Sequence, residues 1–243
     1  EIHKSCYFFL FLAIITGSFH TVFLSVILLF GHECGHFFRA FFYKWKTDKI
    51  TFYPFGGISK FYQDVNCPLK EELSVLLMGP IAQCAVYFFL SKLLTSSYQL
   101  ILLKQIHITM LVFNLLPIYP LDGGRIIQVL FCYFLPFQLS YKIIFILSYF
   151  LLFCFLSFFL LYPNLNFLLA FLILGFRLLI ERKKIKYYIE RFFLERYLKK
   201  NSFKKSKIVK SEKAFYRDFF HILKKNHWYQ LEDDYLKERY QNK

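Results

Sequence analysis

Apolar runs that are too long for the core of a globular domain constrain this chain more than any other feature. Hydrophobic residues make up 57% of the 243 residues, and Phe alone contributes 34 of them. A membrane-spanning helix needs about 20 mostly apolar residues, and several stretches here are of that kind. The same composition excludes low-complexity disorder, collagen and disulfide scaffolds. The sequence therefore predicts an all-α polytopic membrane protein.

About six transmembrane helices are expected. The first, over 5–17, is short for a full span, and a second follows over 19–42. The others are expected over 72–93, over 98–134 with an interruption at Pro117 and Pro120, over 142–161 and over 165–180. The predicted domains are a transmembrane domain (1–180), an amphipathic linker helix (181–200), for which a solvated linker is the alternative, and a cytosolic tail (201–243).

The distribution of charge predicts the orientation in the membrane. Residues 181–243 hold 19 Lys and Arg against 9 Asp and Glu, so they carry +10 of the net charge of +15. The loop 43–70 holds five Lys, whereas the connections at 17–20 and 162–166 hold no Lys or Arg. Positive loops stay in the cytosol. Both termini and the 43–70 loop are therefore expected on the cytosolic side, near anionic lipid.

An HExxH pattern lies inside the second apolar helix. His32 and His36 are four residues apart, so they share one helix face and are spaced to bind one metal ion. Glu33 points to a neighbouring sector, within reach of a metal-bound water. A polar patch between helices is the alternative, but a buried Glu with two His is costly without a metal. His36 lies eight residues before Lys44, about 12 Å along the helix, which places the site below the cytosolic surface.

A third metal ligand is expected at Asp122. A catalytic zinc site needs three protein ligands and an open position for water, and Asp122 is the only other acid that we expect to be buried in the body. It follows a break made by Pro117 and Pro120 and precedes Gly123. Broken helix at membrane depth is tolerated inside protein or beside a water-filled cavity. An Asp-Gly turn or a helix cap is the alternative.

The remaining polar residues of the transmembrane domain are not expected to bind metal. His107 is expected to make an interhelical hydrogen bond, and Asn114 is a candidate to orient the substrate backbone or the oxyanion. Arg39 and Arg177 lie near cytosolic helix ends, where long side chains reach the interface. His20 is expected at the outer interface. The six cysteines include no CxxC pair and are expected to be reduced.

These motifs resemble the site-2 protease family (peptidase family M50) of intramembrane zinc metalloproteases. The resemblance runs from the second helix to about residue 200, through segments 31–36, 53–58 and 114–124. The segments 54–57, 68–72, 114–117, 120–124 and 191–197 are most similar to the sporulation branch of that family. The resemblance implies that His32, His36 and Asp122 bind one zinc ion per chain and that Glu33 is the catalytic acid/base. The sequence before Asp122 is Pro-Leu, where the wider family has Asn-Pro, and the sporulation branch shares this departure.

The resemblance also implies a short membrane-associated β-hairpin or loop that binds the substrate. It matches Pro54, Phe55, Gly56 and Gly57, which would hold an extended segment through backbone hydrogen bonds, as an added β-strand. A Pro-Gly turn without a substrate role is the alternative.

The sporulation branch removes the pro-sequence of the sporulation sigma factor sigma-K. The implied partners are a pro-sigma-K-like precursor, the membrane inhibitor proteins of the sporulation complex, the lipid bilayer and a second copy of the chain, with no nucleic acid. The implied location is the mother-cell membrane around the forespore.

The cytosolic tail resembles a truncated cystathionine-β-synthase (CBS) domain, a fold that senses nucleotide. We expect strand at 207–209, helix at 214–223, strand at 227–231 and helix at 233–240, which is about half of such a domain. ATP binding through the tail is therefore left open, and a partner chain would be needed to complete the fold.

Three alternatives to a sporulation protease are kept. One is a site-2 protease that acts on another membrane substrate, such as an anti-sigma factor. The second is a metal or proton transporter that uses His32, Glu33, His36 and Asp122 as a relay, for which no inverted repeat is visible. The third is an inactive scaffold, which would not need all four residues.

Overall fold

The structure is a computed structural model that describes residues 17, 19–53, 56–62, 65–199, 203, 205–225 and 228–241. Apart from Gly17, the short helix expected over 5–17 lies outside these residues. The chain divides into two compact units: residues 1–63 with 73–115, and residues 64–72 with 116–243. Both units are mostly helical.

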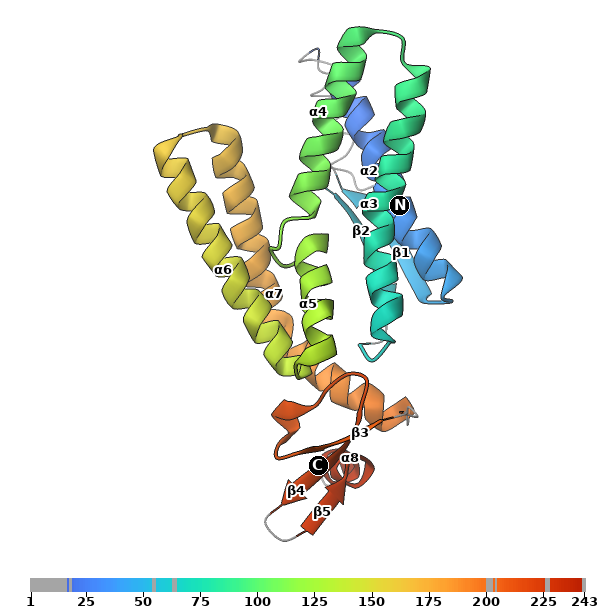
Figure 1. Ribbon diagram of the computed structural model, residues 1–243, viewed down its shortest axis with the longest axis vertical. Coiled ribbons are helices and arrows are strands. Elements are labelled where there is room, and N and C mark those ends of the chain that lie inside the picture. The colour runs from blue at the N-terminus through green and yellow to red at the C-terminus, as the bar shows by residue number, and fades with distance from the viewer. Residues whose placement is uncertain are drawn as a thin grey trace. The chain divides into compact units, whose positions relative to one another are not determined.

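Within its described residues, the first unit contains three long helices and a β-hairpin (Figure 1). The helices are α2 (Phe19–Phe42), α3 (Leu69–Leu93), whose first residues belong to the second unit, and α4 (Ser97–Asn114). The hairpin pairs β1 (Lys46–Tyr53) with β2 (Gly56–Tyr62) in antiparallel register, and β2 contacts α2. The predicted second helix is confirmed, and a β-hairpin is present where one was expected. Its association with the membrane and its role in binding substrate stay predictions.

Two glycines let α2 approach α3 closely. A Cβ on Gly31 would meet Val86 Cγ2 at 2.5 Å, and a Cβ on Gly35 would meet Ala82 Cβ at 2.6 Å. Small residues at a spacing of four allow helix backbones to pack together in membranes. Leu24, Leu28 and Leu103 form the apolar core beside this contact. The close contact brings the polar side chains of the two helices within hydrogen-bonding distance.

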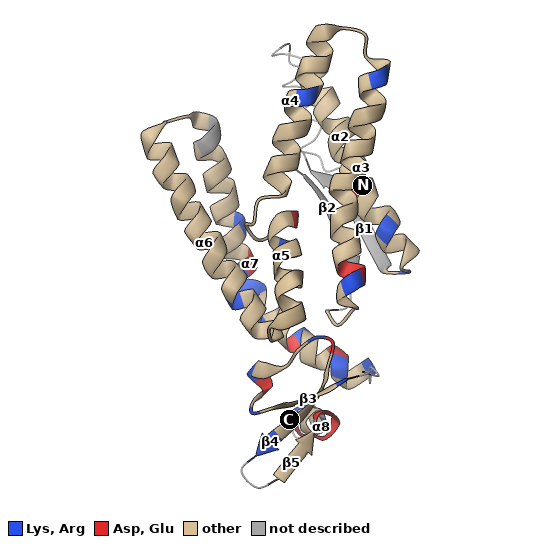
Figure 2. Cartoon of the chain, in the orientation of Figure 1, with Lys and Arg blue, Asp and Glu red and all other residues tan. Residues whose placement is uncertain are grey.

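The second unit contains α5 (Asp122–Phe134), α6 (Phe137–Leu161) and α7 (Leu165–Lys199), followed by the tail. Helices α6 and α7 are neighbours joined at residues 162–164, and α5 lies against α6 (Figure 1). The predicted sixth helix and the amphipathic linker are one continuous helix. Figure 2 shows few charges on α6 and the first half of α7, and many on the second half of α7 and the tail.

The tail is a small sheet with a helix, and one part of its prediction is wrong. The strands are β3 (Ser206–Val209), β4 (Phe220–Lys225) and β5 (Trp228–Leu231); β3 is parallel to β4, and β5 is antiparallel to it. A 3-10 turn (Glu212–Ala214) precedes β4, and α8 (Glu232–Gln241) follows β5. The helix expected over 214–223 is not formed: residues 215–219 are turn and irregular backbone, and 220–223 belong to β4. In β4, buried His221 and Leu223 alternate with more exposed residues, which is the period of a strand.

A buried ion pair ties the tail to the start of α3. Arg217 donates from Nη1 to Glu72 Oε2 at 2.5 Å and from Nη2 to the carbonyl of Cys67 at 2.9 Å. Arg125 on α5 lies 3.6 Å from Glu72 Oε1. Glu72 is only 7% exposed, so the expectation that Asp122 would be the only further buried acid is wrong. The burial of Glu72 is tolerated because two guanidinium groups neutralise its charge.

By length and composition, α2, α3 and α6 can span a membrane. The other predicted spans stay predictions. The described cysteines, at 34, 67, 84, 132 and 154, form no disulfide.

Candidate functional site

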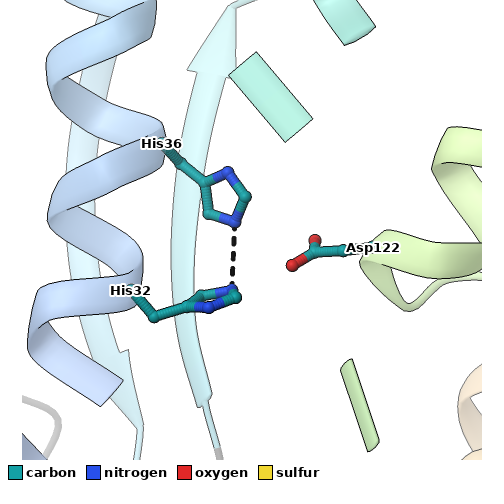
Figure 3. A group of neighbouring side chains, drawn as sticks. All are labelled: His32, His36 and Asp122. Atoms are coloured by element: carbon teal, nitrogen blue, oxygen red, sulfur yellow. Dashed lines mark hydrogen bonds between the residues drawn. The ribbon is translucent and has the colours of Figure 1, made fainter. Parts of the chain in front are cut away.

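Two histidines of α2 meet on its buried face. His32 and His36 are 2% and 8% exposed, and their Nε2 atoms are 3.1 Å apart (Figure 3). Two nitrogens bound to a tetrahedral zinc at about 2.0–2.1 Å lie about 3.3 Å from each other. The pair is therefore spaced as two ligands of one zinc ion would be.

His36 is held by the α3 backbone. Its Nδ1 lies 2.9 Å from the carbonyl oxygen of Val75, which can only accept, so Nδ1 carries the proton and Nε2 keeps its lone pair. The imidazole ring lies against Gly79, where any side chain would overlap it. The sequence did not indicate either residue. Val75 acts through its backbone carbonyl, which every residue has, and Gly79 acts through the absence of a side chain.

His32 is held by a glutamine on α3. Gln83 has no exposed surface, and its Oε1 lies 3.2 Å from His32 Nδ1. Its Nε2 lies 3.1 Å from the carbonyl of His107 and 3.2 Å from His107 Nδ1, and the His107 ring stacks on Tyr87. The predicted interhelical hydrogen bond of His107 is confirmed. Gln83 was missed, although it is a lone amide in an apolar stretch of α3.

Glu33 lies on α2 between the two histidines and is half-buried. One turn beyond His36, Arg39 donates to Ser74 Oγ at 2.7 Å and to the hydroxyl of Tyr43 at 3.0 Å. The bond to Ser74 joins the end of α2 to α3 next to Val75, and the bond to Tyr43 is local to the end of α2. The bond to Ser74 helps to keep the HExxH turn in one register against α3.

Asp122 is the first residue of α5, after an irregular segment. Leu121, in extended conformation, is the N-cap, so Asp122 is the first helical residue and not the cap itself. Ser148 Oγ accepts from the backbone N–H of Tyr119 at 2.9 Å, which anchors the segment to α6. Gly124 is required here, because a Cβ would meet the backbone of Ile118 at 2.5 Å.

Possible ligand atoms from His32, His36 and Asp122 all lie within 4.8 Å of one another (Figure 3). Two imidazole nitrogens and one carboxylate oxygen are a donor set that zinc accepts in catalytic sites. Among the described residues, this is the group of His, Cys, Asp and Glu side chains that could hold a metal ion.

The remaining candidate site residues that the structure describes, together with His20, lie on three different elements of the first unit. Asn114 is the last residue of α4 and is half-buried. Gly56 and Gly57 begin β2, opposite Tyr53 and Phe52 of β1. Pro54 and Phe55 lie outside the described residues. His20 lies in the first turn of α2 and is exposed, as an interfacial residue would be.

Comparison with known proteins gives three kinds of similarity. Residues 20–102 match Peptidase family M50. The chain is 30% identical over 147 residues to Stage IV sporulation protein FB of Bacillus subtilis (strain 168). This aligned region covers 59% of this chain and 51% of that protein. The chain is 30% identical over 149 residues to Zinc metalloprotease MJ0392 of Methanocaldococcus jannaschii, which covers 53% of this chain and 41% of that protein. The chain thus spans about half the length of these relatives, or less.

A solved structure shares the fold. The site-2 protease from Methanocaldococcus jannaschii superposes with a TM-score of 0.55 at 26% identity, over 73% of this chain and 88% of that one. In sequence and in fold, the chain is therefore similar to the site-2 proteases of peptidase family M50.

Proposed function

We propose that this chain is an intramembrane zinc metalloendopeptidase. The observation that carries the proposal is the His32–His36 pair: two buried imidazoles on an apolar helix, with their Nε2 atoms 3.1 Å apart. Asp122 would complete the ligand set, and its proximity to the pair supports this role. The similarity to zinc metalloproteases supports the same chemistry.

The chain's own residues would divide the work of peptide hydrolysis. When bound, zinc supplies a Lewis acid that polarises the scissile carbonyl and brings the pKa of water toward about 7. Glu33 would accept the proton of the attacking water and pass it to the leaving amine. Asn114 would orient the substrate backbone. His32 and His36 would stay neutral, each with its proton on Nδ1.

The β1–β2 hairpin would receive the substrate. A peptide bond inside a helix is shielded from attack, so the substrate has to unwind before cleavage. We propose that residues 54–57 and the start of β2 hold the unwound segment by strand addition. Water and substrate would enter from the cytosolic side.

The substrate that we propose is the pro-sequence of a sigma-K-like precursor. The support is the similarity to Stage IV sporulation protein FB and the motifs shared with the sporulation branch. The same resemblance supports membrane inhibitor proteins as partners and the mother-cell membrane as the location. An anti-sigma factor is the alternative substrate.

Nucleotide binding by the tail stays open. The described tail contains three strands and one helix, which fits part of a CBS-like fold. A change in the melting temperature of the full chain on adding ATP is the direct measurement.

Co-expression of the chain with a tagged pro-sigma-K tests the proposal. We expect the wild type to shorten the precursor on an immunoblot and Glu33→Gln to leave it intact, while both bind zinc. Glu33→Gln is the informative variant because it keeps the shape of the side chain and removes its basicity. Metal flux without cleavage, or equal cleavage by both forms, would contradict the protease assignment.

A further inference from the structure

We propose that Gln83 is a positioning residue that holds His32 in the only tautomer able to bind the metal. The proposal rests on the proposed function, because it assumes that His32 is a zinc ligand. Gln83 lies on α3, opposite the HExxH turn of α2, and has no exposed surface.

The orientation of the Gln83 amide follows from its partner on α4. The carbonyl oxygen of His107 can only accept a hydrogen bond, and it lies 3.1 Å from Gln83 Nε2. The nitrogen end of the amide must therefore face α4. The oxygen end faces His32, at 3.2 Å from its Nδ1.

The tautomer of His32 follows from that orientation. An amide oxygen accepts and cannot donate, so His32 Nδ1 must carry the proton. The lone pair is then on Nε2, the atom that faces His36. In metalloproteins, such an outer hydrogen bond fixes the ring orientation and raises the basicity of the ligand nitrogen.

The other end of the amide is anchored twice. The second amide hydrogen points to His107 Nδ1 at 3.2 Å, and the His107 ring stacks on Tyr87 with centroids 4.3 Å apart. Tyr87 lies one helical turn beyond Gln83. Gln83 is therefore held from α4 and from its own helix, and it has little freedom to release His32.

Zinc affinity of the purified full chain, measured by competition with a chelator, tests this role. We expect Gln83→Met to lose about 10–100-fold in zinc affinity, the usual cost of removing an outer partner of a ligand. Gln83→Glu should stay closer to the wild type, because one carboxyl oxygen still accepts from His32 Nδ1 and the other, whose protonation is favoured by burial, still donates to the His107 carbonyl. Gln128→Met is the matched control: Gln128 is also a buried helical glutamine, 3% exposed, and it contacts Ser140 and Cys132 instead.

Two results would overturn the proposal. Gln83→Met that binds zinc as tightly as Gln128→Met shows that His32 does not need this partner. Gln83→Glu that binds zinc about 10–100-fold more weakly than Gln128→Met shows that accepting from Nδ1 is not its role, and this comparison stands even if Gln83→Met fails to fold. A wild-type chain that binds no zinc would instead overturn the proposed function, and the role of Gln83 with it.

Discussion

A single methyl group at Gly79 should displace His36, one of the proposed metal ligands. In Gly79→Ala the new Cβ would lie 2.8 Å from His36 Cδ2 and closer still to Nε2 and Cε1. Carbon atoms in ordinary contact are about 3.5–4.0 Å apart, so the ring or the helix has to move by about 1 Å. The imidazole has little room to yield, because its Nδ1 is bound to the Val75 carbonyl.

Two magnitudes follow from that displacement. Overpacking of this size costs about 1–3 kcal/mol of stability, and loss of the Val75 hydrogen bond adds about 0.5–1.5 kcal/mol. A shift of about 1 Å in a catalytic group costs on the order of 100-fold in rate. We therefore expect Gly79→Ala to bind zinc weakly and to cleave its substrate about 100-fold more slowly.

Gly175→Ala on α7 is the matched control. Nothing lies within 4 Å of a Cβ at Gly175, so the same change should leave zinc binding unaltered. It should also stabilise the helix by up to about 1 kcal/mol, the difference in helix propensity. Zinc content and cleavage would be measured side by side for both variants. Equal zinc affinity and equal cleavage in the two would refute the steric argument.

The tail provides two further tests. Arg217→Met should lower the free energy of unfolding of the tail by about 3–5 kcal/mol, because it leaves Glu72 buried without its closest partner. Lys237→Met, at an exposed ion pair, should cost at most about 1 kcal/mol, and denaturant unfolding followed by tryptophan fluorescence compares the two. The tail should also lose stability in acid. Burial lowers the pKa of His221 below its ordinary value of 6.5. Burial alone would raise the pKa of Glu232, but hydrogen bonds from His221 and Arg196 hold that pKa below its ordinary value of 4.5. Both groups therefore bind more protons in the unfolded chain than in the folded chain at a given pH. Each stabilises the fold fully at a pH above its ordinary pKa, and this stabilisation is lost as the pH falls through its lower pKa in the folded chain. The same fluorescence measured between pH 7 and pH 3 follows the loss, and a flat response would contradict it.

The helical framework could be predicted from local pattern. The helix expected over 19–42 is α2, and the interruption around Pro117 and Pro120 separates α4 from α5. Proline cannot donate a backbone hydrogen bond, so this break can be predicted from the two prolines alone. The tail shows the opposite case. The apolar segment around His221 has too few residues to separate strand from helix, and pairing with β3 and β5 settles it as a strand.

The ion pairs that Glu72 makes in the second unit could not be predicted from the residue pattern. Arg217 and Glu72 are 145 residues apart, and nothing near either residue indicates the other. Their pairing explains why an acid at the start of an apolar helix is buried. It also accounts for the error about Asp122 as the only further buried acid.

The sequence by itself determined the helix over 19–42 and the placement of His32 and His36 on one of its faces, because the helical repeat brings residues four apart together without help from the rest of the chain. Only the tertiary structure decided how these histidines are held. The partners of their Nδ1 atoms, Gln83 and the Val75 carbonyl, are on another helix, 51 and 39 residues away. Contacts over such separations depend on which backbones approach closely, and the spacing of the glycines that allow the approach does not say which residues lie opposite them.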